Sequence, residues 1–346
     1  MTTMDTTSPK FEQPQQLPPQ ALIMQMAMGF IVSQALAVSA RLEIADLLKD
    51  GAKTAKELAE LTATHEPSLY RLLRALASIG VLYKDADKFS NTPLGDVLRS
   101  DHPASMRAAL HMLGDPEHWN SHGNMQQSVK TGEIAFDYTF GIPVFPYFAE
   151  NPDAAAVFDR SMTSFSTAVA EAVSSVYDFS QAETIADIAG GHGILLAKVL
   201  QKNPQAKGIL FEQPQVLEGN ILAKENVAER STLVSGDFFN EIPVVADIYL
   251  MKFIIHDWND EQSITILNNL AKSAPKGAKL LLVETVVEED DNAPSLSKIM
   301  DLNMLVMTGG RERTPSEYAA LFEKTGFRLE KVYPTAPLQI VEAVRV

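Results

Sequence analysis

The sequence predicts an α/β protein whose second half forms a parallel, doubly wound sheet. From Glu183 onward, short apolar runs alternate with helical stretches, which is the pattern of parallel strands joined by helices. A side chain able to bind a ligand follows each of the first five runs, and ligands of open α/β sheets bind at that carboxyl edge. The first half is mostly helical and predicts a smaller domain of its own.

Composition limits the class of protein. The 346 residues are enough for two domains, and 46 % hydrophobic and 21 % charged residues are ordinary for a globular protein. A formal net charge of −15 disfavours phosphate backbones, so we expect no nucleic-acid partner. Cysteine is absent, which excludes disulfides, thiolate nucleophiles and cysteine zinc sites and fits a cytoplasmic protein.

The N-terminal segment divides into a polar tail and an apolar run. Residues 1–20 are rich in Thr, Pro and Gln and are predicted to be a disordered tail. Residues 21–40 have the length of a membrane span, but Gln25, Ser33 and Gln34 interrupt the run and no basic cluster flanks it. We therefore expect no membrane partner, and interpret the run as a helix buried in a core or a subunit interface.

Residues 21–100 have the order of elements of a winged-helix domain. A capping-box motif at Thr54 begins a short helix, and a second helix is predicted from about residue 67 to 78, where Gly80 ends it. Two short extended runs with a turn between them then predict a hairpin.

A winged helix either binds DNA or mediates dimerisation. DNA binding would place Arg71 and Arg74 on the recognition helix. Residues 42–100 contain 8 Lys and Arg against 9 Asp and Glu, so the segment lacks a basic face. We therefore favour a dimerisation domain.

Residues 101–180 are predicted to be a helical linker that carries part of a substrate pocket. A looser section is expected around residues 132–146. Trp119 lies in this region together with histidine and methionine residues, which usually fill a core. We expect Trp119 to wall an apolar pocket against the second domain.

Residues 181–346 are predicted to form the sheet. The apolar runs at 184–188, 208–211, 232–234, 248–251 and 279–283 are the expected parallel strands. After a further helix, the runs at 327–333 and 338–344 follow each other so closely that they are expected to pair as an antiparallel hairpin.

The residues at the strand ends are suited to hold a nucleoside. The glycine turn at 189–193 allows close backbone approach and leads into a helix N-terminus. Glu212 follows about 20 residues later, where a carboxylate binds ribose hydroxyls. A nicotinamide fingerprint needs glycine where this chain has Leu196. Asp237 and Phe238 are placed to accept from an adenine amino group and to stack on its ring.

His256 is the candidate general base. It lies where the fourth run opens into a loop, and Glu284 ends the fifth run. A neutral imidazole, which titrates near ~6.5, suits the removal of a hydroxyl proton. Glu284 is placed to bind the ring nitrogen that does not take the proton, and so to fix the tautomer of the imidazole. We interpret Asp257, the next residue, as a loop or cap residue.

In their order and spacing these motifs resemble those of a known family. The segments concerned are 187–193, 211–214, 236–239, 252–258 and 309–314. They are similar to the S-adenosylmethionine-dependent O-methyltransferases, and within them to the plant caffeic acid and flavonoid enzymes, hydroxyindole methyltransferase and bacterial polyketide-tailoring enzymes. The resemblance covers nearly the whole chain.

The resemblance implies a class I methyltransferase sheet with a C-terminal antiparallel hairpin, preceded by a winged-helix domain that makes a homodimer. It implies S-adenosyl-L-methionine as the cofactor, which leaves as S-adenosyl-L-homocysteine. The cofactor residues that it implies are Ser166, Ala189, Gly190, Gly191, Gly193, Glu212, Gln213, Asp237, Phe238 and Lys252.

The resemblance also implies the catalytic set and the acceptor pocket. His256 would be the general base, flanked by Glu284 and Glu312. Met162, Trp258 and Met307 would line the acceptor pocket, together with Trp119. No metal is expected, because the acidic run at 288–291 has the character of a solvated loop.

Three positions depart from the plant members of the family. Ala189 stands where they usually have glycine, and Glu212 stands where they usually have aspartate. Neither change abolishes cofactor binding, since alanine is small and glutamate keeps the charge. Met307-Thr308 replaces a histidine-asparagine pair, so a plant-type acceptor does not follow from the resemblance.

We therefore predict an O-methyltransferase that acts on a phenolic or enolic hydroxyl of a small, largely apolar molecule. The alternatives are a winged-helix transcription factor, a cofactor-binding regulator, and an enzyme with a changed reaction such as decarboxylation or hydroxylation. The presence of His256 disfavours the regulator. Phenols, enols, hydroxyindoles and polyketides remain open as acceptors.

Overall fold

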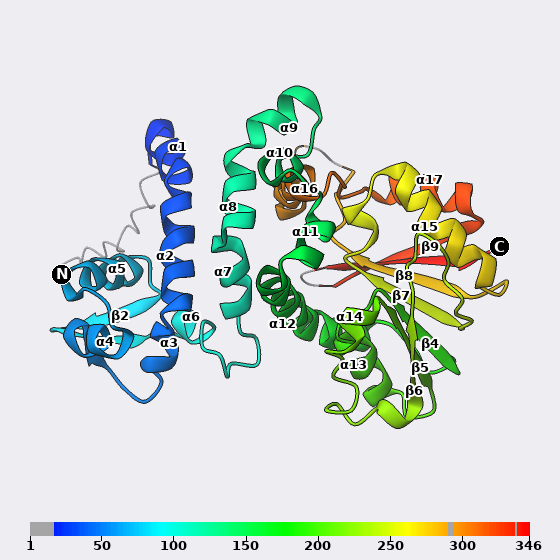
Figure 1. The fold of residues 1–346 in the computed structure, drawn as a ribbon, viewed down its shortest axis with the longest axis horizontal. Helices are drawn as coiled ribbons and strands as arrows, with labels where there is room; N and C mark the ends of the chain where they lie inside the picture. The colour runs from blue at the N-terminus through cyan, green and yellow to red at the C-terminus, as the bar shows by residue number, and fades with distance from the viewer. Residues whose placement is uncertain (1–16, 290–291, 293, 336–337) are drawn as a thin grey trace, which may run out of the picture.

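The computed structural model describes residues 17–289, 292, 294–335 and 338–346 (Figure 1). Residues 1–16, most of the predicted tail, lie outside the described residues. The last two residues of that tail, Pro19 and Gln20, already belong to α1 (Pro19–Ala27). Proline suits this first turn because its missing N–H has no intrahelical partner there.

The N-terminal part has the predicted order of helix, helix and hairpin. After α1 and α2 (Gly29–Arg41) its elements are α3 (Ile44–Leu47), β1 (Lys53–Thr54), α4 (Ala55–Thr62), α5 (Glu66–Ser78), β2 (Leu82–Asp85), β3 (Lys88–Asn91) and α6 (Pro93–Asp96). The expected capping box is present at Thr54, whose hydroxyl accepts from the backbone N–H of Glu57. The three strands pair in the order β1-β3-β2 and complete a winged helix.

The apolar run of α1 and α2 is exposed in the single chain. Pro19–Arg41 is the one helical stretch in the described part of the chain with the length and apolar character of a membrane span, and almost none of it is buried. Ile23 is 67 % exposed, Met26 73 % and Phe30 57 %. Only the end of the run, with Ala37, Ser39 and Ala40, is buried in this chain's own core, so for most of the run the subunit interface is the expectation that remains.

A set of helices connects the two parts of the molecule (Figure 1). They are α7 (Arg107–Gly114), α8 (Pro116–Gly123), α9 (Met125–Thr131), α10 (Ala135–Phe140), α11 (Val144–Glu150) and α12 (Pro152–Val176). The section expected to be loose contains α10, and Gly132 and Gly141, both left-handed, end α9 and α10. α12 packs against α13 (Ile194–Lys202) of the C-terminal part and against α7, which in turn packs against α2 of the N-terminal part.

The C-terminal part is built on a seven-stranded sheet in the order β6-β5-β4-β7-β8-β10-β9. Its strands are β4 (Thr184–Ile188), β5 (Lys207–Glu212), β6 (Ser231–Ser235), β7 (Ile248–Lys252), β8 (Lys279–Glu284), β9 (Phe327–Pro334) and β10 (Gln339–Arg345). β4 to β8 are parallel, whereas β10 pairs antiparallel with both β8 and β9. The predicted doubly wound sheet with a C-terminal hairpin is confirmed.

Helices cover both faces of this sheet. Leu250 and Leu281 pack with α12 and α13 on one face, whereas their neighbours Tyr249 and Leu280 pack on the other. That other face is covered by α15 (Asp260–Ser273) and α17 (Pro315–Thr325). Both faces are apolar because each strand alternates its side chains between two buried layers. The remaining short elements are α14 (Pro214–Leu217), η1 (Ala228–Arg230), η2 (Ile255–Asp257) and α16 (Leu296–Met307).

A buried carboxylate ties the hairpin to the rest of the sheet. Glu342 on β10 is 4 % exposed. Its oxygens accept from the hydroxyls of Tyr177 (2.8 Å) and Tyr333 (2.9 Å) and from Lys279 Nζ (2.6 Å). The lysine and tyrosine donors hold the pKa of Glu342 below its usual range, although burial acts in the opposite direction.

We expect Glu342→Gln to lower the free energy of unfolding by roughly 1–3 kcal/mol at neutral pH, because a hydrogen bond to a charged group contributes about that much. A depressed pKa in the folded state means that this stability is present above the unfolded pKa and lost as pH falls through the folded value. The deficit, measured by urea unfolding, should therefore close below pH ~4. Glu330→Gln on β9, which removes an exposed pair with Arg328, should change stability by less than about 0.5 kcal/mol.

Candidate active site

The site lies along the carboxyl edge of the parallel strands. β5, β4, β7 and β8 are neighbours in the sheet and run in the same direction, so their last residues fall on one edge. Asp187, Glu212, Lys252 and Glu284 lie at or next to those ends. The alignment of strand-end residues inferred from the sequence is therefore present.

The glycine turn adopts a left-handed backbone at three positions. Gly191 has φ 59° and Gly193 has φ 83°, and Ala189 has φ 54° although it carries a Cβ. At Gly190 a Cβ would lie 2.5 Å from the carboxyl group of Asp187, so only glycine allows this close approach. The turn leads into α13, whose first backbone N–H groups face the same edge.

Ala189→Gly should relieve local strain. A left-handed alanine costs roughly 1 kcal/mol, and the added freedom of glycine in the unfolded chain offsets about half of that or more. We expect the melting temperature to stay level or to rise by about 1–3 °C in thermal unfolding. Ala63, exposed at the end of α4 with φ 51°, is the matched control, and Ala63→Gly should behave alike. A clear loss of stability in Ala189→Gly alone would show that the alanine methyl group has a packing role.

Glu212 holds the glycine turn as well as facing the edge. Its Oε2 accepts from the backbone N–H of Gly191 at 2.9 Å, and its Oε1 accepts from the N–H of Gln213 at 2.7 Å. Burial raises the pKa of Glu212, and these two N–H groups act against that rise. The sequence argument expected only a ligand-binding carboxylate here, whereas the structure adds a backbone clamp.

Asp187 is a buried carboxylate for which the sequence predicted no role. It is 1 % exposed, and neither oxygen has a hydrogen-bond partner of normal geometry among the described residues, although the backbone N–H of Leu196 lies close enough to lower its pKa. Burial raises the pKa of Asp187 to about 7, with the charge of Lys252 acting in the opposite direction. Its position as the last acidic residue before the glycine turn is the feature of the sequence that could have indicated a role in the site.

Lys252 lies at the end of β7, near enough to Asp187 for their charges to interact. Burial lowers the pKa of Lys252 to about 8, and the charges of Asp187, Glu284 and Asp257 limit the shift. Its Nζ lies 4.4 Å from the ring centroid of Phe253. A cation over an aromatic face is held there by the ring quadrupole.

Phe253 connects this lysine to the candidate base. Its φ of 56° is rare for a bulky residue, and such strain persists only where the surrounding structure enforces it. Its ring stacks on that of His256, with centroids 5.0 Å apart and planes 12° apart. Phe253 thus fixes the plane of the imidazole, a role that the sequence did not indicate.

His256 is buried and bonded through one ring nitrogen. Nδ1 lies 3.0 Å from Oε1 of Glu312 and 3.7 Å from Oε2 of Glu284. Glu284 uses its Oε1 to accept from the backbone N–H groups of Ile254 (3.1 Å) and Ile255 (3.0 Å). Of the two acids expected to flank His256, Glu312 makes the hydrogen bond to the imidazole, and Glu284 holds the backbone at Ile254 and Ile255.

Glu312 reaches His256 because a glycine allows two loops to touch. A Cβ at Gly310 would lie 2.0 Å from the backbone oxygen of His256. Burial and the nearby Asp301 raise the pKa of Glu312 to about 8. The neighbouring arginines have other partners, since Arg311 pairs with Glu317 and Arg313 with Asp260. A purely structural ion pair between Glu312 and its neighbours is therefore not what the structure shows.

Asp257 faces the other nitrogen of the imidazole. Its Oδ1 lies 3.7 Å from Nε2 of His256. The cap of α15 is Asn259, whose side chain accepts from Gln262 N–H, so Asp257 is not the cap but lies in the short turn η2, as the loop alternative expected. Burial raises the pKa of Asp257 to about 7, with His256 acting against the rise.

His256, Glu284 and Glu312 also meet the geometric requirement for a metal site, since one donor atom of each lies within 4.8 Å of the others. One oxygen of each acid is already used, Oε1 of Glu312 by the imidazole and Oε1 of Glu284 by two backbone N–H groups, whereas Oε2 of each acid has no hydrogen-bond partner among the described residues. We read the set as an oriented base, and the absence of a metal stays a prediction.

An aromatic group lies beside the end of β6. The ring of Trp258 is edge-on to Phe238 (5.9 Å) and to Phe239 (4.7 Å). Asp237 is exposed and its Oδ1 accepts from the N–H of Phe239 at 2.8 Å. Trp258 therefore borders the residues assigned to the adenine, in addition to the acceptor side for which it was predicted.

α12 carries Met162 and Ser166 past the glycine turn. The hydroxyl of Thr163, on the same helix, lies 2.9 Å from Nδ1 of His192 in that turn. Ser166 is buried, and its hydroxyl donates to the backbone oxygen of Met162 at 2.6 Å. The middle of α12 is thus next to the predicted cofactor site.

The last two predicted acceptor residues lie in different surroundings. Met307 is buried in a cluster with Phe136 and Val144, against which Phe145 and Phe148 pack. In the described part of the chain, the ring contact of Trp119 is Phe30 of α2, with centroids 6.5 Å apart. Trp119 therefore borders the N-terminal part, and its role in an acceptor pocket stays a prediction.

Comparison with known proteins identifies the family. Residues 24–101 match an O-methyltransferase dimerisation domain, and residues 122–328 match an O-methyltransferase domain. The phenazine O-methyltransferase of Lysobacter antibioticus is 43 % identical over 331 residues, which cover 94 % of this chain and 96 % of that protein. The chain belongs to the O-methyltransferase family.

Solved structures agree with this assignment. The mitomycin 7-O-methyltransferase superimposes with a TM-score of 0.87 at 37 % identity, over 94 % of this methyltransferase and 98 % of that chain. Human N-acetylserotonin methyltransferase, in complex with S-adenosylmethionine, does so with a TM-score of 0.87 at 26 % identity, over 96 % and 99 %. The methyltransferase is an S-adenosylmethionine-dependent enzyme that O-methylates small molecules, on the class I fold that the sequence predicted.

Proposed function

We propose that the methyltransferase transfers the methyl group to a phenolic or enolic hydroxyl of a small, largely apolar acceptor, and that His256 takes the hydroxyl proton. The observation that carries this proposal is the hydrogen bond between Nδ1 of His256 and Glu312. With Nδ1 as the donor, Nε2 keeps its lone pair, which is the state that a general base needs.

The residues at the strand ends fit S-adenosylmethionine. Asp187 offers a buried carboxylate without a hydrogen-bond partner of normal geometry among the described residues, which suits a cationic group, and the turn 189–193 lets the ligand approach the backbone. We propose that Glu212 and Gln213 hold the ribose and that Asp237 and Phe238 hold the adenine. Lys252 and Ser166 would border the methionine part. When bound, the cofactor supplies a methyl group on a sulfonium, which is a strong electrophile.

The task of the protein is then to position the acceptor and to remove one proton. Met162, Trp258 and Met307 would hold the acceptor ring, and positioning of this kind lowers a barrier by several kcal/mol. After proton transfer, the positive charge on the imidazole would favour the ionised forms of Glu312 and Glu284, whose oxygens lie within 4 Å of Nδ1, and the ionised acids would stabilise the imidazolium. General-base assistance contributes roughly a hundred- to ten-thousand-fold.

We further propose a homodimer formed through α1 and α2. The support is the dimerisation-domain match at residues 24–101 and the exposed apolar side chains of the same helices. The proposed units are residues 21–100 for dimerisation, 101–180 for the pocket and 181–346 for the cofactor, in a cytoplasmic enzyme without nucleic-acid or membrane partners. Light scattering that shows a stable monomer would contradict the dimer.

The proposed reaction is tested with S-adenosylmethionine labelled in its methyl group and a panel of phenols and enols. We expect at least one panel member to gain the labelled methyl group in mass spectrometry, with one S-adenosylhomocysteine formed for each transfer. Conversion of a panel member without incorporation of the label would point instead to a changed reaction on the same scaffold.

A further inference from the structure

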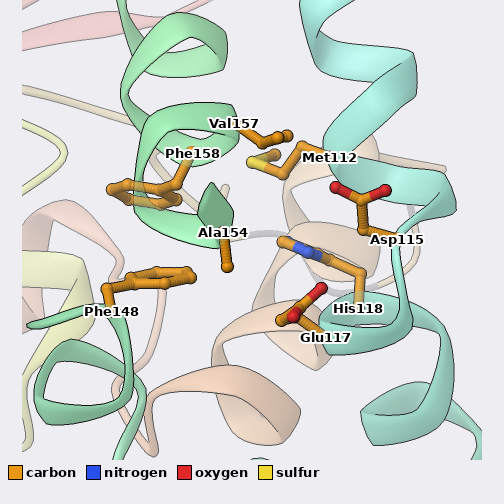
Figure 2. Close-up of a pocket in the computed structure, with 8 residues that line it drawn as sticks. All are labelled: Met112, Asp115, Glu117, His118, Phe148, Ala154, Val157 and Phe158. Carbon is orange, nitrogen blue, oxygen red and sulfur yellow. The ribbon is translucent and has the colours of Figure 1, made fainter. Parts of the chain in front are cut away.

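A small cavity separates α8 from α11 and α12 (Figure 2). On the α12 side it is lined by apolar side chains, among them Ala154 and Phe158, and Phe148 of α11 stacks on Phe158 with centroids 4.9 Å apart. On the other side lie Asp115, Glu117 and His118. The cavity holds about 10 Å³, which is room for a single water molecule or a group of that size.

His118 is the polar group of this cavity that has no partner. It is 7 % exposed, and its Nδ1 is buried without a hydrogen-bond partner among the described residues. The two carboxylates beside it are engaged elsewhere, because Asp115 pairs with Arg41 at 2.6 Å and Glu117 accepts from the hydroxyl of Tyr147 at 3.0 Å. A buried imidazole that lacks a partner costs free energy unless a ligand supplies one.

The imidazole is aimed at the apolar side of the cavity. Figure 2 shows the ring of His118 extending from α8 toward Ala154 of α12, with Asp115 and Glu117 on either side of it. Burial and the nearby His122 lower the pKa of His118 to about 4, so the ring is neutral at physiological pH. A neutral ring offers one donor and one acceptor and no charge to balance an anion.

The cavity lies at one end of a row of side chains that leads to the proposed acceptor site. Ala154 and Phe158 line it, and Met162 and Ser166 follow at the same four-residue spacing on α12, so all four lie along one side of the helix. Phe145 links the two regions, since its ring lies 6.5 Å from Phe158 and 5.4 Å from Trp258. An aromatic acceptor held near Met162 would thus extend toward His118.

We infer that His118 binds a neutral hydrogen-bonding substituent, an amino or hydroxyl group, at the end of the acceptor ring remote from the methylated hydroxyl. The inference rests on the proposed function, because it assigns this cavity to the acceptor. A carboxylate at the same place is disfavoured, since Glu117 already contributes a negative charge and neutral His118 cannot offset a second one.

The test uses fluorescent naphthols that share the hydroxyl to be methylated: 2-naphthol, its 6-amino and 7-amino derivatives, and 6-hydroxy-2-naphthoic acid. Binding to the full-length enzyme saturated with S-adenosylhomocysteine is followed by fluorescence, so no turnover is required. We expect at least one aminonaphthol to bind roughly 3- to 10-fold more tightly than 2-naphthol, as one net hydrogen bond predicts, and the carboxylate to bind most weakly.

The variant His118→Leu should remove this preference, leaving the aminonaphthols within about 2-fold of 2-naphthol. His118→Gln keeps a neutral polar group and should retain part of it, which covers the case in which the leucine variant fails to fold. His65→Leu, which replaces an exposed histidine of the N-terminal part outside the cavity lining, is the control and should keep the wild-type preference.

Equal affinities for all probes in the wild type, including no measurable binding of any, would overturn the inference. An amino preference that persists in His118→Leu would do the same. Failure of the proposed function is distinguishable, because it would appear as an absence of methyl transfer while the binding preference, measured without turnover, was unaffected.

Discussion

His256→Ala is expected to lower kcat by roughly 10²- to 10⁴-fold while leaving the affinity for S-adenosylmethionine within about 3-fold of the wild type. The imidazole would touch the acceptor hydroxyl and not the nucleoside, so its loss removes proton transfer and leaves cofactor binding in place. Steady-state rates with a methylated panel member give kcat, and isothermal titration gives the dissociation constant of the cofactor.

The comparison variants separate the base from its surroundings. Glu312→Gln keeps the shape of the side chain but weakens the hydrogen bond that orients the imidazole through Nδ1. We expect a smaller loss of kcat than in His256→Ala, on the order of 10-fold. His102→Ala, which removes a partly exposed imidazole, should leave kcat unchanged. Near-normal turnover of His256→Ala would remove the base assignment.

Glu212→Gln is expected to weaken S-adenosylmethionine binding by about 10²-fold. The carboxylate would bind ribose hydroxyls through charge-assisted bonds, each worth about 1.5–3 kcal/mol, and the amide keeps only one acceptor oxygen. The amide nitrogen would also face the N–H of Gly191 or Gln213, which the carboxylate now accepts. Isothermal titration of the cofactor measures the change.

The control for Glu212 is nearby. Glu218 is exposed just beyond α14, and Glu218→Gln should leave the dissociation constant within about 2-fold. Thermal unfolding without cofactor shows whether Glu212→Gln also loosens the glycine turn. Wild-type cofactor affinity in Glu212→Gln would contradict the assignment of the ribose to this edge.

The sheet could be predicted because its strands are buried on both faces. Runs such as 184–188 and 279–283 are mostly apolar, and the structure places β4 and β8 at those positions with at most one residue added. The short link after residue 333 likewise required an antiparallel hairpin, and β9 and β10 form one. Local pattern is sufficient where a strand is wholly buried.

The details of the site depend on contacts that sequence spacing does not contain. That Glu312 rather than Glu284 bonds Nδ1 of His256 follows from the close approach of Gly310 to the His256 loop. The stacking of Phe253 requires a left-handed backbone that its side chain does not suggest. Asp257 resembled a cap because it precedes a helix, and only the fold places it beside Nε2.

The most direct test of the central claim compares wild type and His256→Ala over phenols of graded acidity at one pH. If His256 takes the acceptor proton, the loss of kcat should be largest for weakly acidic phenols, with pKa near ~10, and should shrink toward none for nitrophenols already ionised at the assay pH. The same loss for every phenol, whatever its acidity, would contradict the account.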